Sequence, residues 1–247
     1  MSHTVHTTIH ISDDQPNAIE AIKYMQSDLD SDHVFDLNKL IAKPEQFNLY
    51  RQPLNESLVY FLTDRMKKPL DFKRFDECSA SNYSENGAEC ISCLERWLKH
   101  YDKKGVLQES GKKSLPLGLK VAETLDELYE SGCAILSAYL AHGVSNIEEW
   151  CVQNWGNEWN TFDGTIDGNS IYFASKNESV DSMIDLFAYR FNLTMIAYSM
   201  DEGRYEWNHR TYVEGQLTNI EYDDEAIRLQ VETAIYGEPD QYENEEC

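Results

Sequence analysis

Residues 148–162 read EEWCVQNWGNEWNTF, and this stretch joins a helical pattern to the first strand of a hairpin. The helix is predicted to begin at a Ser145 cap and to end near Gly156, where a left-handed stop is easiest. Residues 158–175 then read as strand, turn and strand, with Asp167-Gly168 as the hairpin signal. This region therefore fixes where helix gives way to sheet.

Four residues of the same stretch are predicted to form a structural motif. The rings of Trp155 and Trp159 are expected to cover the junction between helix and sheet, and Gly156 permits the sharp turn. Nothing catalytic lies at a useful spacing beside them, which favours a structural joint over a catalytic or ligand site. The motif consists of Trp150, Trp155, Gly156 and Trp159.

The remaining patterns predict an α+β fold. Apolar periodicity places strands at 3–12, 193–200 and 204–215, helices after Pro16 and at 179–191 and 223–236, and a short extended or mixed segment at 33–41. The resulting order is strand–helix, then strand–strand–helix–strand. That order predicts a ferredoxin-like split βαβ antiparallel sheet with two helices on one face.

A large helical insertion is predicted inside this sheet domain. Helical patterns occupy 58–68, 88–104 and 119–143, and polar loops lie at 78–87 and 107–118. The predicted organisation is a first part of the ferredoxin-like domain at 1–49, the insertion at 50–143, the second part at 144–236 and an acidic tail at 237–247.

Charge is the strongest compositional signal. The formal net charge is −23, and residues 121–247 carry 26 acidic against 5 basic side chains, whereas residues 1–120 carry 18 against 16. Such a field repels phosphate backbones and anionic lipid and attracts cationic surfaces. It is typical of a surface that steers a basic partner, with solubility alone as the alternative.

The chain is expected to be a folded cytoplasmic protein. Hydrophobic residues make up 41% and aromatic residues 12% of the 247 residues, enough to bury a core. No apolar run approaches the about 18 residues of a membrane span, and the first twelve residues, MSHTVHTTIHIS, lack the pattern of a signal peptide. Six cysteines are too sparse for a disulfide scaffold.

Metal and catalytic motifs are weak. Cys78, Cys90, Cys93 and His100 could supply the four ligands of zinc, but Cys90 and Cys93 lie in a helical pattern, which favours buried thiols. His6 and His10 share a strand face and lack a carboxylate partner. Nucleophile and phosphate-loop motifs are absent, so neither an enzyme nor a cofactor is expected, and a metal-dependent enzyme is the alternative.

Nucleic-acid binding by the sheet is not expected. The strands carry the aromatic residues Tyr172, Phe173, Tyr198, Tyr205 and Trp207, as RNA-binding sheets do. The basic flanks are missing, because residues 121–247 contain only Lys176, Arg190, Arg204, Arg210 and Arg228. Direct binding would fall to Lys103, Lys104, Lys112, Lys113 and Lys120 of the insertion, and this is the alternative function.

A family resemblance follows from two of these stretches. Residues 150–160 resemble the Trp-Cys-x-x-Asn-Trp-Gly-Thr-Lys-Trp-Asn/Asp motif of the YubB-type proteins of phages and plasmids, which have a ferredoxin-like domain. Residues 35–47, FDLNKLIAKPEQF, resemble that family's Phe-Asn-x-Ile-Ile-Pro-x-Pro-Glu segment. Asn157-Glu158 replaces its Thr-Lys, Ala42 replaces its first Pro, and 50–118 match no family pattern. The resemblance implies a mobile element in a bacterial host and no assigned enzymatic activity.

A gene on a mobile element and an acidic second half, residues 121–247, together indicate a counter-defence function. We expect a non-enzymatic inhibitor, an anti-CRISPR protein before an anti-restriction protein. Its partner would be a CRISPR effector or restriction enzyme with a basic surface, and it would bind neither nucleic acid nor membrane. A structural component of a virion or conjugation apparatus is a further alternative. The residues expected to contact the partner are Glu221, Asp223, Asp224 and Glu225.

Overall fold

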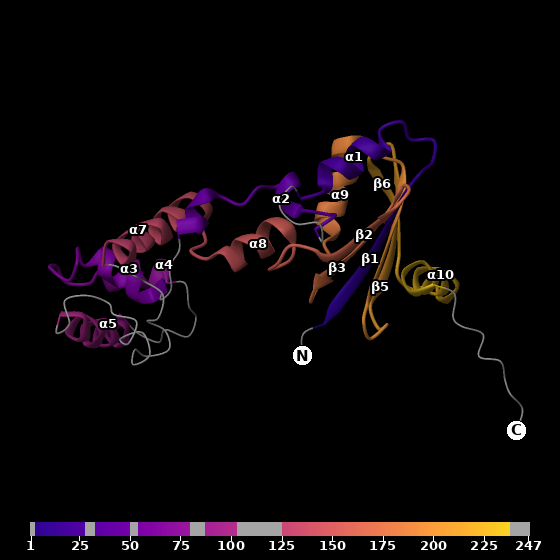
Figure 1. Cartoon of the computed structure of the whole chain (residues 1–247). Helices are drawn as coiled ribbons and strands as arrows, with labels where there is room; N and C mark the ends of the chain where they lie inside the picture. Colours follow the sequence, from indigo (N-terminus) through magenta and orange to yellow (C-terminus); the bar gives the residue numbers. More distant parts are fainter. Residues whose placement is uncertain (1–2, 28–32, 50–53, 80–86, 103–124, 238–247) are drawn as a thin grey trace, which may run out of the picture. The chain divides into compact units, whose positions relative to one another are not determined.

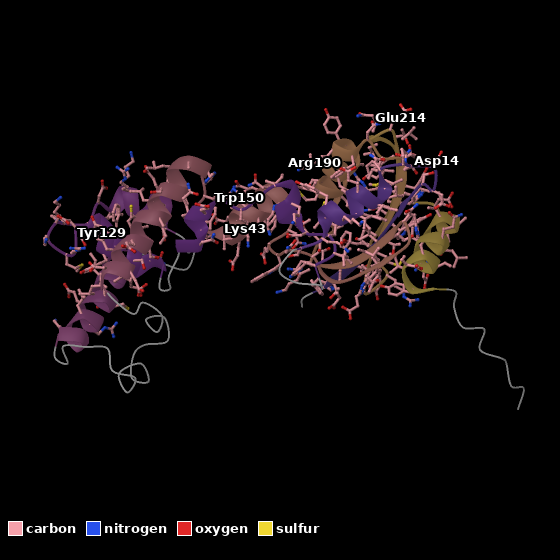
Figure 2. The ribbon with its side chains drawn as sticks, turned by 45° about the horizontal axis from the view of Figure 1, so that its top comes forward. Asp14, Lys43, Tyr129, Trp150, Arg190 and Glu214 are labelled. Carbon is pink, nitrogen blue, oxygen red and sulfur yellow. The ribbon has the colours of Figure 1, made fainter. Side chains whose placement is uncertain are left out.

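The computed structural model describes residues 3–27, 33–49, 54–79, 87–102 and 125–237 (Figure 1). The chain divides into two compact units, which we call the sheet unit, Met1–Ala42 with Cys151–Cys247, and the helical unit, Lys43–Trp150. Figure 2 labels Lys43 and Trp150, the ends of the helical unit. The sequence predicts this insertion at 50–143. The expected tail beyond residue 237 and loop 107–118 lie outside the described residues.

The sheet unit is built on a six-stranded antiparallel sheet in the order β2-β3-β1-β4-β5-β6. Helices α1 and α9 lie on one face and α10 on the other (Figure 1). This architecture confirms the expected α+β class. The elements are β1 (Thr4–Ile11), α1 (Ala18–Met25), α2 (Leu37–Leu40), β2 (Phe162–Asp167), β3 (Ser170–Lys176), α9 (Asp181–Phe191), β4 (Met195–Asp201), β5 (Trp207–Val213), β6 (Gln216–Glu221) and α10 (Glu225–Tyr236).

Strand register explains the core between the sheet and α9. Ile9 of β1 pairs with Ile171 and Ala197, and all three are fully buried because alternate residues of a strand face the same side. Phe35 stacks on Phe173 at 4.7 Å between ring centroids and meets Phe187 of α9 edge-on at 5.3 Å. These aromatic contacts fasten α9 to the sheet.

Two local predictions are wrong. No strand is predicted after 204–215, yet β6 adds a sixth strand at the edge of the sheet. The segment 33–41, expected to be extended or mixed, is mixed, with the short helix α2 at Leu37–Leu40. The cap of α8 (Ile147–Trp155) is Asn146 rather than Ser145, because the Asn146 side chain accepts the backbone N–H of Glu149 at 2.7 Å.

The helical unit has its own hydrophobic core. Leu58, Phe75, Leu94, Leu128 and Ile135 are fully buried in it. Its elements are η1 (Glu45–Leu49), α3 (Leu54–Leu62), α4 (Phe72–Cys78), α5 (Gly87–Asp102), α7 (Leu125–His142) and the first residues of α8. Within the part of the chain that the structure describes, no helix is long and apolar enough to cross a membrane.

The packing of α3 on α7 generates a prediction at Gly132. A Cβ there would lie 2.1 Å from the carbonyl oxygen of Ser57, which is backbone on α3. Alanine stabilises an ordinary helix by about 1 kcal/mol relative to glycine. We expect Gly132→Ala instead to lower the free energy of unfolding by about 1–3 kcal/mol through overpacking. Urea unfolding followed by circular dichroism checks the sign. Ser137→Ala, an exposed change on the same helix, is the control.

Candidate functional site

A buried polar cluster ties β5 to α9 in the sheet unit. Arg210, only 8% exposed, donates from Nη2 to both carboxylate oxygens of Asp185 at 2.7 and 2.9 Å and from Nη1 to Asp181 Oδ2 at 3.2 Å. Its Nε–H donates to Tyr212 Oη at 2.9 Å, and that hydroxyl donates to Asp185 Oδ1 at 2.7 Å. The positions meet because 210 and 212 share a strand face and 181 and 185 share a helix face.

The pKa values of Arg210 and Tyr212 are both raised within this cluster. Burial by itself lowers the pKa of Arg210, but the bonds to Asp185 and Tyr212 and the charge of Asp181 outweigh it, and the pKa is raised overall. Burial and the bond to Asp185 raise the pKa of Tyr212. The guanidinium therefore stays charged and the phenol neutral. The hydrogen bonds of this cluster hold β5 against α9.

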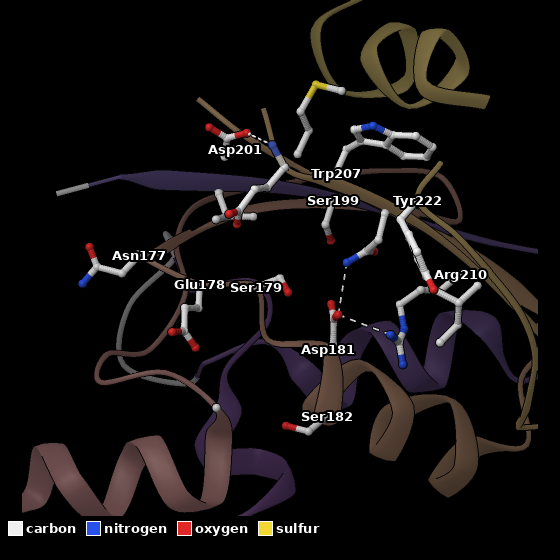
Figure 3. A pocket seen from close by; sticks show the side chains of 16 residues that line it. Asn177, Glu178, Ser179, Asp181, Ser182, Ser199, Asp201, Trp207, Arg210 and Tyr222 are labelled. Carbon is white, nitrogen blue, oxygen red and sulfur yellow. Dashed lines mark hydrogen bonds and ion pairs between the residues drawn. The ribbon is translucent and has the colours of Figure 1, made fainter. Parts of the chain in front are cut away.

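A cavity of about 610 Å³ opens beside the cluster, between the N-terminal end of α9 and the ends of β4, β5 and β6 (Figure 3). Figure 3 shows Ser199 on the sheet and Asp181 at the start of α9 pointing toward each other, with Arg210 and Tyr222 at one side. Asn208 and Ile220 also line it. The cavity thus lies between the buried cluster and the outermost strand.

The chemistry of the cavity is that of hydrogen-bond acceptors. Asn208 Nδ2 donates to Asp181 Oδ2 at 3.1 Å, but Oδ1 of each of these two residues is buried and lacks a partner in the described part of the chain. The charged lining residues are four carboxylates and one guanidinium: Glu178, Asp181, Asp201, Glu206 and Arg210. Such a cavity suits a cationic group with N–H donors and repels phosphate.

The four carboxylates expected to contact a partner come together where β6 leads into α10. Glu221 ends β6 and accepts from Asn219 at 2.9 Å, and Asp223 is exposed. Asp224 is the N-cap of α10 and accepts the backbone N–H of Ala226 at 2.8 Å. Glu225 pairs with Arg228 at 2.7 Å.

Exposed apolar side chains surround this acidic turn. Tyr222 is 62% exposed, Leu229 57% and Ile220 38%. The turn thus places four carboxylates next to exposed aromatic and aliphatic side chains. We call residues 217–229 the acidic turn surface.

The four residues of the tryptophan motif have different environments. Trp155 is buried, and its Nε1–H donates to the carbonyl of Ile41 at 2.9 Å. Gly156 has φ +75°, the left-handed conformation expected at the end of the helix. Trp159 is 48% exposed, with the Lys176 ammonium 5.1 Å from its ring centroid, so its ring does not close the junction.

The remaining residue of the motif, Trp150, belongs to the helical unit. It is buried, and its ring centroid lies 6.2 Å from that of Phe47. It therefore contributes to the core of that unit, whereas Trp155 contributes to the sheet unit.

The cysteines of the zinc alternative lie in the helical unit. Cys78 and Cys90 belong to its hydrophobic core, and the Cys78 thiol donates to the Arg74 carbonyl at 2.5 Å. Burial raises the pKa of Cys78 to about 11, which keeps the thiol protonated. Among the described residues, no three His, Cys, Asp or Glu side chains are placed to hold a metal ion. The side chain of His100 lies outside them.

The basic residues of the nucleic-acid alternative are outside the description as well. Lys103, Lys104, Lys112, Lys113 and Lys120 fall in the segment 103–124, which the structure does not describe.

Three histidines lie on the sheet face that carries α10. His6 Nδ1 is 2.6 Å from Tyr172 Oη, and His10 Nδ1 is 2.6 Å from Ser170 Oγ. The ring of His209 stacks on Tyr198 at 5.1 Å. Burial lowers the pKa of all three histidines, against opposing charges of Glu202 and Asp163 at His6 and of Glu221 at His209. They are neutral at pH 7.

Comparisons with known proteins yield one distant structural likeness. No family model and no curated protein matches the chain. The solved structure of the protein api92 from Yersinia pseudotuberculosis, of the family DUF1281, aligns at 11% identity over 91% of this chain and 99% of that protein, with a TM-score of 0.38. A likeness at this level carries neither fold nor function over to this chain.

The buried cluster generates a prediction at Tyr212. Tyr212→Phe removes only the hydroxyl, so Arg210 Nε–H loses its acceptor while the core volume is kept. We expect the free energy of unfolding to fall by about 1–3 kcal/mol. Tyr189→Phe, at a position 68% exposed, should leave it unchanged. Equal stability of both variants in urea unfolding would show that the hydroxyl bridge contributes nothing.

The histidine face generates a prediction of pH dependence. The folded-state pKa values are lowered from 6.5, so below about pH 6.5 the unfolded chain binds more protons than the folded chain. We expect the free energy of unfolding to fall as pH drops from 7.5 to 5.5. The fall should be smaller in His6→Gln and His209→Gln variants. An identical pH profile in wild type and both variants would refute this assignment.

Proposed function

We propose that the protein is a non-enzymatic counter-defence protein of a mobile element, most specifically an anti-CRISPR inhibitor. It binds the cationic nucleic-acid-binding surface, or a subunit, of a host nucleoprotein complex in the bacterial cytoplasm. The observation that carries the proposal is the acidic turn surface, where Glu221, Asp223, Asp224 and Glu225 gather beside exposed apolar side chains.

The fold assignment in this proposal is a ferredoxin-like core with two added strands. The order β2-β3-β1-β4, with α1 after β1 and α9 after β3, supports a split βαβ arrangement, to which β5 and β6 are appended at the β4 edge. Membership of the YubB-type proteins is part of the same proposal. It rests on the motifs at residues 35–47 and 150–160.

Electrostatics supports a protein partner over a nucleic acid. With 26 acidic and 5 basic side chains in residues 121–247, counterion release cannot drive this half onto phosphates. The same field accelerates encounter with a Lys- and Arg-lined channel, and Tyr222 and Leu229 supply apolar anchors for the docked state. Inhibition is then stoichiometric, because carboxylates occupy the surface that normally holds phosphates.

The test is capture from lysates of bacteria that carry intact defence systems. The first variant combines Glu221→Gln, Asp223→Lys, Asp224→Asn and Glu225→Lys, in which asparagine keeps the capping oxygen of α10. We expect the wild-type protein to capture a nucleic-acid-binding complex, identified by mass spectrometry, and the variant to bind it at least tenfold more weakly.

The control variant carries Glu20→Lys, Glu158→Lys and Asp167→Lys, which change the formal charge by the same amount at exposed positions elsewhere in the sheet unit. It should bind as the wild type does. Equal binding by both variants contradicts the assigned surface. A salt-sensitive gel shift of DNA or RNA by the wild-type protein would favour the alternative, a nucleic-acid-binding accessory protein.

A further inference from the structure

The outermost strand β6 lacks the lysine or proline that commonly protects a sheet edge. Five of its six residues are exposed, and among the described residues it pairs with β5 alone. Edge strands present unpaired N–H and C=O groups and are commonly guarded by lysine or proline. The β6 sequence, QLTNIE, contains no Lys, Arg or Pro. The β5–β6 pair has a bulge whose extra residue, Thr218, lies on β6, because Thr211 pairs with Asn219 and Tyr212 with Leu217. The Asn219–Glu221 end pairs regularly.

This edge borders the acceptor-lined cavity. Ile220 pairs with Arg210, so both side chains face the α9 side of the sheet, and Ile220 and Tyr222 are themselves part of the cavity lining. A strand added along β6 would direct alternate side chains to that side, since side chains alternate between the two faces. One of them would stand at the mouth of the cavity.

The cavity fits an ammonium or guanidinium group. Among the described residues that line the cavity, Asp181 Oδ1 and Asn208 Oδ1 are buried and lack a hydrogen-bond partner, and Ser199 Oγ forms a 3.0 Å hydrogen bond with Thr7 Oγ1. An ammonium carries three N–H donors for such a set. The positive end of the α9 dipole is already offset by Asp181 in its first turn.

We propose that β6 receives an extended, basic segment of a partner protein as a seventh strand, with one lysine or arginine side chain entering the cavity. This inference rests on the proposed function and assigns its binding mode. Charge selects the occupant, because a second copy of this chain also has a net charge of −23 and would be repelled by the same field. A basic strand instead pairs its backbone with β6 and its charges with the acidic turn surface.

The probe is a ten-residue peptide of alternating lysine and valine, acetylated and amidated at its ends, added to the full-length ¹⁵N-labelled protein. We expect amide shifts and slowed hydrogen exchange at Gln216–Glu221. A peptide with methylated backbone nitrogens and a peptide with glutamate in place of lysine should bind at least tenfold more weakly. Absence of shifts in β6, or equal binding of the methylated peptide, overturns the proposal.

Two double variants compare lysines placed on the β6 edge with lysines placed elsewhere on the surface. Leu217→Lys with Ile220→Lys guards β6 and should weaken peptide binding at least tenfold. Val152→Lys with Ile19→Lys adds the same charge at positions 46% and 64% exposed and should leave binding within about twofold, because attraction is reduced only at long range. If both double variants weaken peptide binding equally, the change in net charge alone explains the effect, and binding as an added strand is overturned.

The two proposals fail differently. If the edge variant still captures the defence complex while the acidic turn variant does not, the strand mode is wrong and the proposed function stands. If neither variant changes capture, the proposed function loses its assigned surface as well.

Discussion

The ion pair between Arg210 Nη2 and the carboxylate of Asp185 is the interaction on which the sheet unit depends. It joins β5 to α9 through a guanidinium that is 8% exposed, and Tyr212 bridges the two groups. A shift of β5 by one residue would turn Arg210 to the α10 face and leave Asp185 unpaired. Arg210 is buried whereas the Asp185 side chain is 41% exposed, so removing Asp185 would leave a buried guanidinium without this partner, which is costly. We infer that its role is to fix the register of β5, and through β5 the position of β6.

The sequence predicts the strongly patterned elements well and the polar ones badly. β1 and α9 have clear apolar periodicity, and the structure confirms both. β6 has no such pattern because both of its faces are exposed, and its turn, Glu214-Gly215, is not the Asn-Gly or Asp-Gly pair that announces a hairpin. Edge strands of this kind are stabilised by pairing with a neighbour, which no local pattern records.

The roles of individual charged residues in the candidate site are likewise not predictable from the local sequence. The acidic run at 221–225 is visible in the sequence, and the structure brings it together on one turn. Asp181 and Asp185 resemble any other carboxylates of an acidic chain. Their partner, Arg210, lies 25 residues beyond Asp185 and is set opposite it only by the fold. The composition therefore reveals the negative electrostatic field of this protein. Only the tertiary structure shows which carboxylates pair within the fold and which face solvent.

Contacts fix the edge strand β6 at both of its ends. At its start, Gly215 at φ +76° donates its N–H to the Leu193 carbonyl at 2.8 Å, and a Cβ there would lie 3.0 Å from the Ala188 carbonyl oxygen at the end of α9. At its other end, Ile220 pairs with Arg210, which the start and middle of α9 hold. An edge anchored in this way loses little conformational freedom when another strand binds. Because ordering costs oppose association, such preorganisation strengthens binding without any added contact area.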